Sequence, residues 1–255
     1  MSLSNLAPVI VLAAGLGLGH WLAWQITVQT PTRASLHPAR WNALNRAVPA
    51  VLMVAALIGL ALHVQAADGQ APVDAAVDSF LNPVRYEALI ALFEWITLVG
   101  NTGSLIAIAA LAAIVLWGIG RRRDAALVLT VWLGAYATTW ALKHLIDRPR
   151  PDFAFDVVAH SPSFPSGHAT GSLALFGVLA YVAARRTARF RWRFEIVFWA
   201  AVLIALVSVS RIYLSVHHAS DVFAGFLVGG VWLYGAIAAG RTGGRTGEKV
   251  RPPRP

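Results

Sequence analysis

Residues 143–151 read KHLIDRPRP, residues 165–168 read PSGH, and residues 210–221 read SRIYLSVHHASD. Each of these three polar clusters stands at the end of a long apolar run. Together they supply four cations, several histidines and a carboxylate within otherwise hydrophobic sequence. This inventory suits a site that holds a phosphate and attacks it, provided that all three clusters lie on one side of a membrane.

The composition is that of a membrane protein. Hydrophobic residues make up 57% of the 255 residues and charged residues 13%, whereas soluble domains carry about 25% charged residues. Recurrent apolar runs are long enough to cross about 30 Å of hydrocarbon as helices. We therefore expect an all-α, polytopic transmembrane helix bundle. The absence of cysteine excludes disulfides and thiol catalysis.

Seven apolar runs predict spanning helices. The first lacks the basic n-region of a signal peptide and is too long for its apolar core, so we expect it to be retained. Residues 68–83 are interpreted as an acidic loop, and residues 85–98 as a short amphipathic helix at the membrane interface. The runs cover about residues 6–28, 47–67, 100–119, 125–142, 166–184, 194–209 and 217–239.

These runs divide the chain into three parts. Residues 1–46 are predicted to hold an N-terminal transmembrane helix and a basic cytoplasmic loop. Residues 47–239 form the membrane domain that contains the three clusters. Residues 240–255 are rich in Gly, Arg and Pro and are predicted to be a disordered, basic cytoplasmic tail.

The basic residues predict the orientation of the bundle. Sixteen of the 21 fall on one side, which is expected to be cytoplasmic because cytoplasmic loops carry an excess of Lys and Arg. Four of the other five belong to the clusters, which are therefore predicted to face outward. The sixteen are Arg33, Arg40, Arg46, Arg121, Arg122, Arg123, Arg185, Arg186, Arg189, Arg191, Arg193, Arg241, Arg245, Lys249, Arg251 and Arg254.

Four basic residues thus lie on the side where topology does not require them, namely Lys143, Arg148, Arg150 and Arg211. The planar guanidinium group of arginine donates two parallel hydrogen bonds to an oxyanion, and lysine acts as a point charge. A single cation at a helix end could instead snorkel to lipid headgroups. Several cations beside histidines favour an anion site. The net charge of +9 comes with no nucleic-acid-binding motif.

Ser166, Gly167 and His168 are predicted to open a helix. Serine is a good N-cap, and glycine lets a ligand approach the backbone closely. A helix N-terminus presents unpaired N–H groups and a partial positive charge, which together suit an anion. His168 just inside this terminus could donate a proton to a leaving oxygen.

His217 and Asp221 are four residues apart and are predicted to share one face at the start of the last helix. A carboxylate that accepts a hydrogen bond from Nδ1–H would leave Nε2 free to attack. His218 is three residues from Asp221, so spacing alone leaves either histidine possible. A metal site is disfavoured because a further ligand at suitable spacing is missing and nearby cations would repel the ion.

The three clusters resemble the type 2 phosphatidic acid phosphatase superfamily. Its motifs are Lys-x6-Arg-Pro, Pro-Ser-Gly-His and Ser-Arg-x5-His-x3-Asp. All three are present without a departure, in order and over about 80 residues. They read here Lys143 to Arg150-Pro151, Pro165-Ser166-Gly167-His168, and Ser210-Arg211 to His217 to Asp221. The resemblance implies a six-helix phosphatase core, to which the N-terminal helix would be an addition.

The resemblance also implies the residue roles. His217 matches the nucleophile that forms a phosphohistidine, Asp221 orients it, and His168 protonates the leaving group and then activates water. Neither a metal nor another cofactor is implied. The partners would be a lipid phosphate substrate and membrane lipids, with no nucleic acid. The residues implied to bind the phosphoryl oxygens are Lys143, Arg150, Ser166, Gly167 and Arg211.

The expected function is hydrolysis of a lipid phosphate or diphosphate at the outer face of a bacterial inner membrane. Candidate substrates are undecaprenyl pyrophosphate, phosphatidylglycerol phosphate and lipid A phosphate. Vanadate-dependent haloperoxidases have a similar site, but they are soluble proteins, which the spanning helices argue against. A lipid-headgroup-binding or transport protein would explain the cations but would give the histidines and Asp221 no task.

Overall fold

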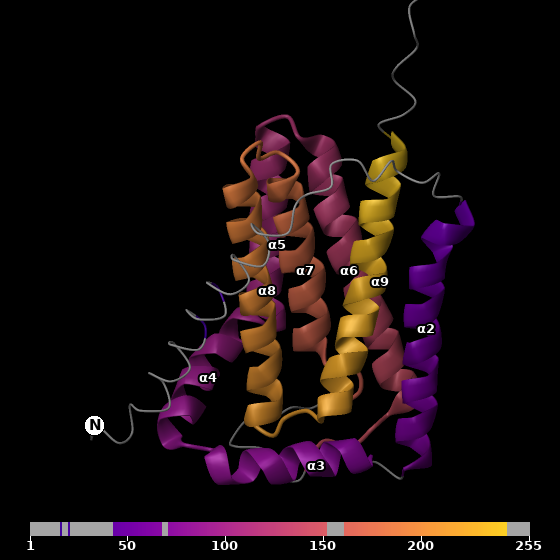
Figure 1. Ribbon diagram of the computed structural model, residues 1–255, viewed down its shortest axis with the longest axis vertical. Helices are drawn as coiled ribbons and strands as arrows, with labels where there is room; N and C mark the ends of the chain where they lie inside the picture. The colour runs from indigo at the N-terminus through magenta and orange to yellow at the C-terminus, as the bar shows by residue number, and fades with distance from the viewer. Residues whose placement is uncertain (1–15, 17–19, 21–42, 68–70, 152–160, 244–255) are drawn as a thin grey trace, which may run out of the picture.

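The computed structural model describes residues 43–67, 71–151 and 161–243, together with Leu16 and His20. Throughout these ranges the regular structure is helical, which confirms the all-α prediction (Figure 1). The helices are α2 (Ala43–Ala66), α3 (Pro72–Leu81), the 3-10 turn η1 (Asn82–Val84), α4 (Glu87–Val99), α5 (Thr102–Gly118), α6 (Arg122–Ile146), α7 (Gly167–Ala184), α8 (Phe190–Tyr213) and α9 (Ala219–Gly243).

Five of the described helices, α2 and α6 to α9, are long and apolar enough to cross a membrane. Helices α4 and α5 meet at a bend of 44° and together qualify as a sixth span. The described part of the chain thus has the predicted six-span core. The predicted first helix over residues 6–28 lies outside the described residues except for Leu16 and His20. His20 Nε2 lies 3.0 Å from a carboxylate oxygen of Glu195 on α8.

Large apolar side chains lie on both the inside and the outside of the bundle. Leu105, Trp132 and Leu175 belong to the buried core shared by α5, α6 and α7. Leu52 on α2 and Ile114 on α5 are more than 60% exposed. Because hydrocarbon is as apolar as a protein core, such outward-facing side chains are expected of helices that contact lipid.

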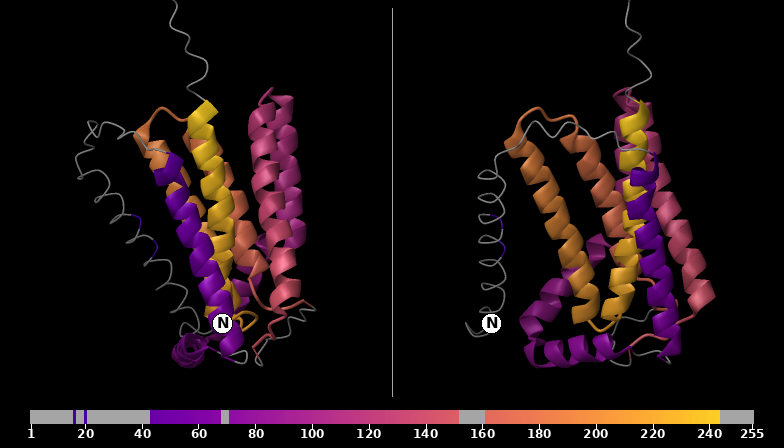
Figure 2. Two further views of the ribbon diagram at one scale, coloured as in Figure 1. Left: turned by 90° about the vertical axis from the view of Figure 1, so that its right-hand side faces the viewer. Right: turned by 45° about the vertical axis from the view of Figure 1, so that its right-hand side comes forward.

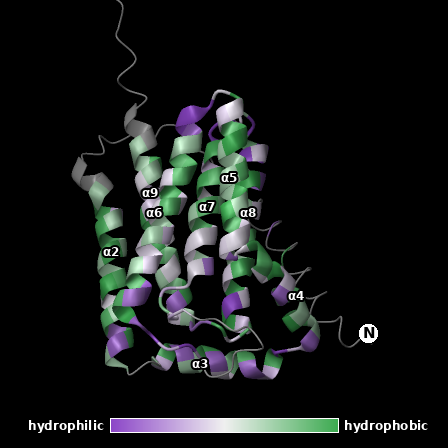
Figure 3. Ribbon diagram, turned by 180° about the vertical axis from the view of Figure 1, so that it is seen from behind, coloured by the Kyte–Doolittle hydropathy of each residue, from purple (hydrophilic) through white to green (hydrophobic). Residues whose placement is uncertain are grey.

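The residues predicted to be an acidic loop instead form α3, which lies across one end of the bundle (Figure 1). Pro72 at the first turn and apolar residues at Val73, Val77 and Phe80 favour this helix. Polar residues concentrate at this end and at the opposite end, which carries the connections after α5 and α7 (Figure 3). The short helix predicted over residues 85–98 is present as α4, which is tilted and packs on α8.

Helices α7 and α9 pack closely because α9 carries Gly225 and Gly229 one turn apart. A Cβ atom at Gly225 would lie 2.9 Å from the Ser166 carbonyl oxygen, and one at Gly229 would lie 2.9 Å from the Thr170 carbonyl oxygen. Small residues at this spacing let membrane helices approach each other. On the other side of α9 packs α2, as the two views of Figure 2 show. The glycine pair thus holds α9 against the first turn of α7.

We expect Gly225→Ala to lower the thermal stability of the detergent-solubilised protein by about 1–3 kcal/mol, because its methyl group would press on backbone atoms of α7. The measurement is a melting curve followed by tryptophan fluorescence. Gly235→Ala on the same helix is the matched control, since a Cβ there meets nothing within 4 Å. Equal melting temperatures for the two variants would contradict the tight α7–α9 contact.

Candidate active site

His217 and Asp221 lie together, although not on one helix as the spacing predicted. Asp221 is in the first turn of α9, whereas His217 lies in the turn between α8 and α9. His217 Nδ1 is 3.4 Å from Asp221 Oδ2. Both side chains are buried. The close approach therefore comes from the turn that precedes α9 and not from a helical repeat.

The same carboxylate contacts two further groups, and these separate the roles of the two histidines. Ser163 Oγ donates to Asp221 Oδ2 and lies 3.3 Å from His217 Nδ1. The backbone N–H of His218 donates to Asp221 Oδ2 at 2.9 Å, as in the capping of a helix by its third residue. Thus His217 presents its ring to Asp221, whereas His218 presents its backbone.

Burial lowers the pKa of His217 to about 3, with Arg150 and Lys143 adding to this effect and Asp221 opposing it. The imidazole is therefore neutral near pH 7. When Nδ1–H faces Asp221 and Ser163, Nε2 carries the lone pair. Arg150 Nη1 lies 3.4 Å from that Nε2 atom. A phosphoryl group held by Arg150 would therefore be next to a nucleophile.

Arg150 and Lys143 line the site from the first cluster. Arg150 Nη1 donates to the Val216 carbonyl oxygen at 2.7 Å, and its Nε donates to that of Ser161 at 2.9 Å. Lys143, in the last turn of α6, donates to the carbonyl oxygen of Pro162. These backbone acceptors hold the two cations near the turn that carries His217.

Arg211 joins the site from the last turn of α8. Its Nη1 donates to Thr97 Oγ1 on α4 at 2.6 Å, and its carbonyl oxygen accepts from the His217 N–H at 3.1 Å. Its Nε is buried and has no hydrogen-bond partner among the described residues. A buried donor without a hydrogen-bond partner lowers the stability of the folded protein by about 1–3 kcal/mol. An anionic ligand would supply the missing acceptor, so this position suits one.

The N-terminus of α7 opens beside these cations. Ser166 is its N-cap residue, yet its side chain makes no capping hydrogen bond, and Oγ has no partner among the described residues. The Ser166 N–H donates to the Asp221 carbonyl oxygen at 3.0 Å, which joins the second cluster to the third. Gly167 and His168 form the first turn of α7. Ser166 Oγ and the uncapped N–H groups form a ready anion site.

His168 packs against the bend between α4 and α5. A Cβ atom at Gly100, the last residue before the bend, would lie 3.0 Å from His168 Cδ2. Thr97, the partner of Arg211, is on the preceding turn of α4. His168 and Arg211 therefore both approach the same end of α4. The structure thus brings all eight predicted site residues to one end of the bundle.

Several buried polar residues around Asp221 fall outside the eight residues predicted for the site. Arg148 donates from Nη1 to Asp221 Oδ1 at 2.6 Å and from Nη2 to Asp74 Oδ2 at 2.8 Å. Ser220 and Ser163 complete the group. The sequence did draw attention to Arg148, because it is a basic residue on the predicted outer side of the membrane, where topology requires none. Asp74 had no such signal, because residues 68–83 were interpreted as an acidic loop.

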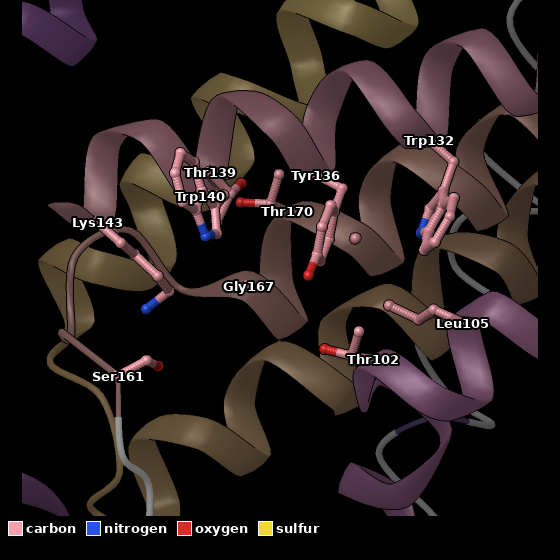
Figure 4. A pocket seen from close by; sticks show the side chains of 11 residues that line it. Thr102, Leu105, Trp132, Tyr136, Thr139, Trp140, Lys143, Ser161, Gly167 and Thr170 are labelled. Carbon is pink, nitrogen blue, oxygen red and sulfur yellow. The ribbon is translucent and has the colours of Figure 1, made fainter.

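A pocket of about 180 Å³ adjoins the site between α5, α6 and α7. Lys143, Ser161 and Gly167 line the end nearest the cations, as Figure 4 shows. Leu105 and Trp132 line the other end. The pocket therefore leads from the cations to a part of its wall that includes large apolar side chains. Thr102, Tyr136, Thr139, Trp140, Thr170 and Gly171 complete the lining.

Comparisons with known proteins agree with this geometry. The profile of the PAP2 superfamily matches residues 124–243. The chain is 30% identical to phosphatidylglycerophosphatase B of Bacillus subtilis over 174 residues, which cover 68% of this chain and 84% of that protein. It is 30% identical to a putative undecaprenyl-diphosphatase of Escherichia coli over 143 residues, which cover 53% and 66% of the two chains.

A solved structure has the same fold. It is the crystal structure of a transmembrane PAP2-type phosphatidylglycerolphosphate phosphatase from Bacillus subtilis, with a TM-score of 0.67 and 26% sequence identity. The match covers 79% of this chain and 98% of that one. The helix arrangement around the three clusters is therefore one already seen in a phosphatase.

Proposed function

This chain belongs to the PAP2 superfamily and is a membrane phosphatase of lipid phosphates, and we propose that it works through a phosphohistidine formed on His217. The observation that carries the proposal is the position of the His217 ring. Its Nδ1 faces Asp221 at 3.4 Å, while its Nε2 lies 3.4 Å from the Arg150 guanidinium. The ring is thus oriented on one side and next to a phosphate-binding group on the other.

In the first step, the Nε2 lone pair of His217 forms a bond to phosphorus. The bond between phosphorus and the lipid oxygen breaks, and its electron pair stays on that oxygen, which takes a proton from His168. The ring becomes positively charged as it attacks, and the Asp221 carboxylate stabilises that charge. The products are a dephosphorylated lipid and the phosphohistidine.

In the second step, water attacks the phosphohistidine. His168, now neutral, accepts a proton from the water as its oxygen bonds to phosphorus. The bond from phosphorus to Nε2 breaks, and its electron pair returns to the ring. Inorganic phosphate leaves, and both histidines regain their starting protonation states. The same residue therefore acts as acid and then as base.

The charge on the transferring phosphoryl group is proposed to be stabilised by the cations and the α7 N-terminus. Ser166 Oγ and Arg211 Nε are buried donors without a hydrogen-bond partner among the described residues. Lys143, Arg150 and the Gly167 N–H are the other proposed donors. Fixed donors of this kind need no reorganisation when charge develops, which makes electrostatic stabilisation effective.

The lipid chain is proposed to follow the pocket between α5 and α6. Its end nearest the cations carries Lys143 and Gly167, and its far end carries Leu105 and Trp132 (Figure 4). A headgroup at the cations would thus place the attached hydrocarbon against apolar side chains. The proposed substrates are undecaprenyl pyrophosphate, phosphatidylglycerol phosphate or lipid A phosphate.

We infer that the site faces the outer, periplasmic side of a bacterial inner membrane. The basic connections around Arg121 and Arg185 lie at the end of the bundle opposite to α3. An excess of basic residues is typical of cytoplasmic loops, which supports the proposed orientation.

The purified protein in detergent micelles is expected to release inorganic phosphate from these three lipid phosphates, at rates that EDTA leaves unchanged. The measurement is phosphate release with and without EDTA, and comparison of the lipids identifies the preferred mono- or diphosphate. Binding of the lipids without turnover would contradict the proposal and favour a headgroup-binding or transport protein. Loss of turnover in EDTA would contradict the metal-free mechanism.

A further inference from the structure

Asp74 is a buried carboxylate far from the three clusters in sequence but in contact with them in the fold. It lies in the first turn of α3, is 1% exposed, and contacts the start of α9. Its Oδ1 accepts from the Ser220 N–H at 2.9 Å, and its Oδ2 accepts from Ser220 Oγ at 2.7 Å. A buried charge persists only where partners compensate for its lost hydration.

The compensating charge is on Arg148, which is 3% exposed. Its Nη2 donates to Asp74 Oδ2 at 2.8 Å, and its Nη1 donates to Asp221 Oδ1 at 2.6 Å. One planar guanidinium therefore bridges two carboxylates, a geometry that the rigid fork of arginine permits. Because Arg148 contacts Oδ1, the other oxygen of Asp221 is left to face His217 and Ser163.

The charges of this group do not cancel. Within this group of three side chains, Asp74 and Asp221 contribute two carboxylates and Arg148 one guanidinium, so the group as a whole is negative. If Arg148 contacted Asp221 alone, the pair would be neutral. The imidazole of His217 becomes positive as Nε2 bonds to phosphorus, and a net negative neighbour stabilises that state more than a neutral one does.

We propose that Asp74 is a positioning residue of the active site, which acts through Arg148 to fix the Asp221 carboxylate and to offset the positive charge that Arg148 places beside that carboxylate. The proposal rests on the proposed function, since it assigns Asp74 a task in the attack by that histidine. Helix α3 then supports the catalytic group in addition to covering the end of the bundle.

The test is Asp74→Asn, with Asp78→Asn as the matched control on the same helix. Asp78 makes a partly exposed contact to Arg85 at 3.4 Å and does not contact Arg148 or Asp221. We expect Asp74→Asn to lower kcat by about tenfold with KM within twofold of wild type, because the buried group loses one charge. Asp78→Asn is expected to retain wild-type kcat and KM.

A different result is expected if Asp74 only holds α3 against the bundle and has no effect on catalysis. Asp74→Asn would then lower the melting temperature, while kcat per mole of monodisperse protein would stay within twofold of wild type, and this outcome overturns the inference. Turnover by the wild type in the same assay separates that outcome from failure of the proposed function. Absence of wild-type turnover on every lipid phosphate would overturn both.

Ser220→Ala decides the question if Asp74→Asn fails to fold. It keeps both carboxylates and Arg148 but removes the hydroxyl that donates to Asp74 and accepts from Arg148. We expect kcat to fall about threefold with KM unchanged. Wild-type kcat in this variant would overturn the inference.

Discussion

Replacing His217 with alanine is expected to lower kcat for phosphate release by at least about 10⁴-fold, because covalent attack on phosphorus then has no nucleophile. The neighbouring His218 does not present its ring to Asp221, so it is poorly placed to substitute. Release of inorganic phosphate from the preferred lipid measures the effect. His144→Ala is the matched control, because this exposed histidine contacts the Trp140 carbonyl oxygen and lies outside the site.

The covalent intermediate gives a second readout. Wild-type protein quenched during turnover of a ³²P-labelled substrate is expected to carry label that acid releases and alkali does not, as a phosphorus–nitrogen bond requires. His217→Ala is expected to carry none. Label retained by His217→Ala, or full activity in that variant, would contradict the mechanism and return His218 to consideration.

Replacing His168 with alanine is expected to lower kcat for a lipid phosphate by about 10³-fold, because the alkoxide leaving group then has no acid to protonate it. The expected loss in the first step is much smaller for p-nitrophenyl phosphate, whose leaving group needs no proton. Attack by water still needs His168 as a base. The variant should therefore accumulate phosphohistidine from p-nitrophenyl phosphate.

Rapid-quench labelling measures that accumulation. His144→Ala is again the control, and it should turn over both substrates as the wild type does. Equal losses on the two substrates, with no labelled protein, would show that His168 does not act as the acid. In that case the role of His168 would be limited to packing against Gly100 at the α4–α5 bend.

The spanning helices could be predicted well from sequence, because contact with lipid and burial in the core both require apolar side chains. Helix α7 was predicted to begin near Ser166 and begins at Gly167, and the bent α4–α5 pair with α2 and α6 to α9 gives the six-span core. The boundaries of the others differ by a few residues, as α8 shows by extending to Tyr213 and so including Arg211. Polar residues at a membrane surface do not reveal where a helix ends.

Other regions were misread because their structure depends on contacts. Helix α3 was taken for a loop, since Asp74 and Asp78 suggested solvent, yet Asp74 is buried against Arg148 and Ser220. The tail was predicted from residue 240, whereas α9 continues to Gly243. Residues 1–42 and 244–255 lie outside the described ranges except for Leu16 and His20, so the predictions for the first helix, its basic loop and the rest of the tail stay predictions.

The membrane bundle and the three motifs could be read from the sequence alone, because apolar length and local spacing are properties of consecutive residues. The groups that surround the proposed nucleophile are known only from the folded arrangement of the helices and turns. His217 lies in a turn, and its ring, not that of His218, faces Asp221. Arg148 donates hydrogen bonds to both Asp74 and Asp221, each of which is more than 70 residues away in the chain. Such pairings follow from burial, since buried charges must find partners wherever the fold places them.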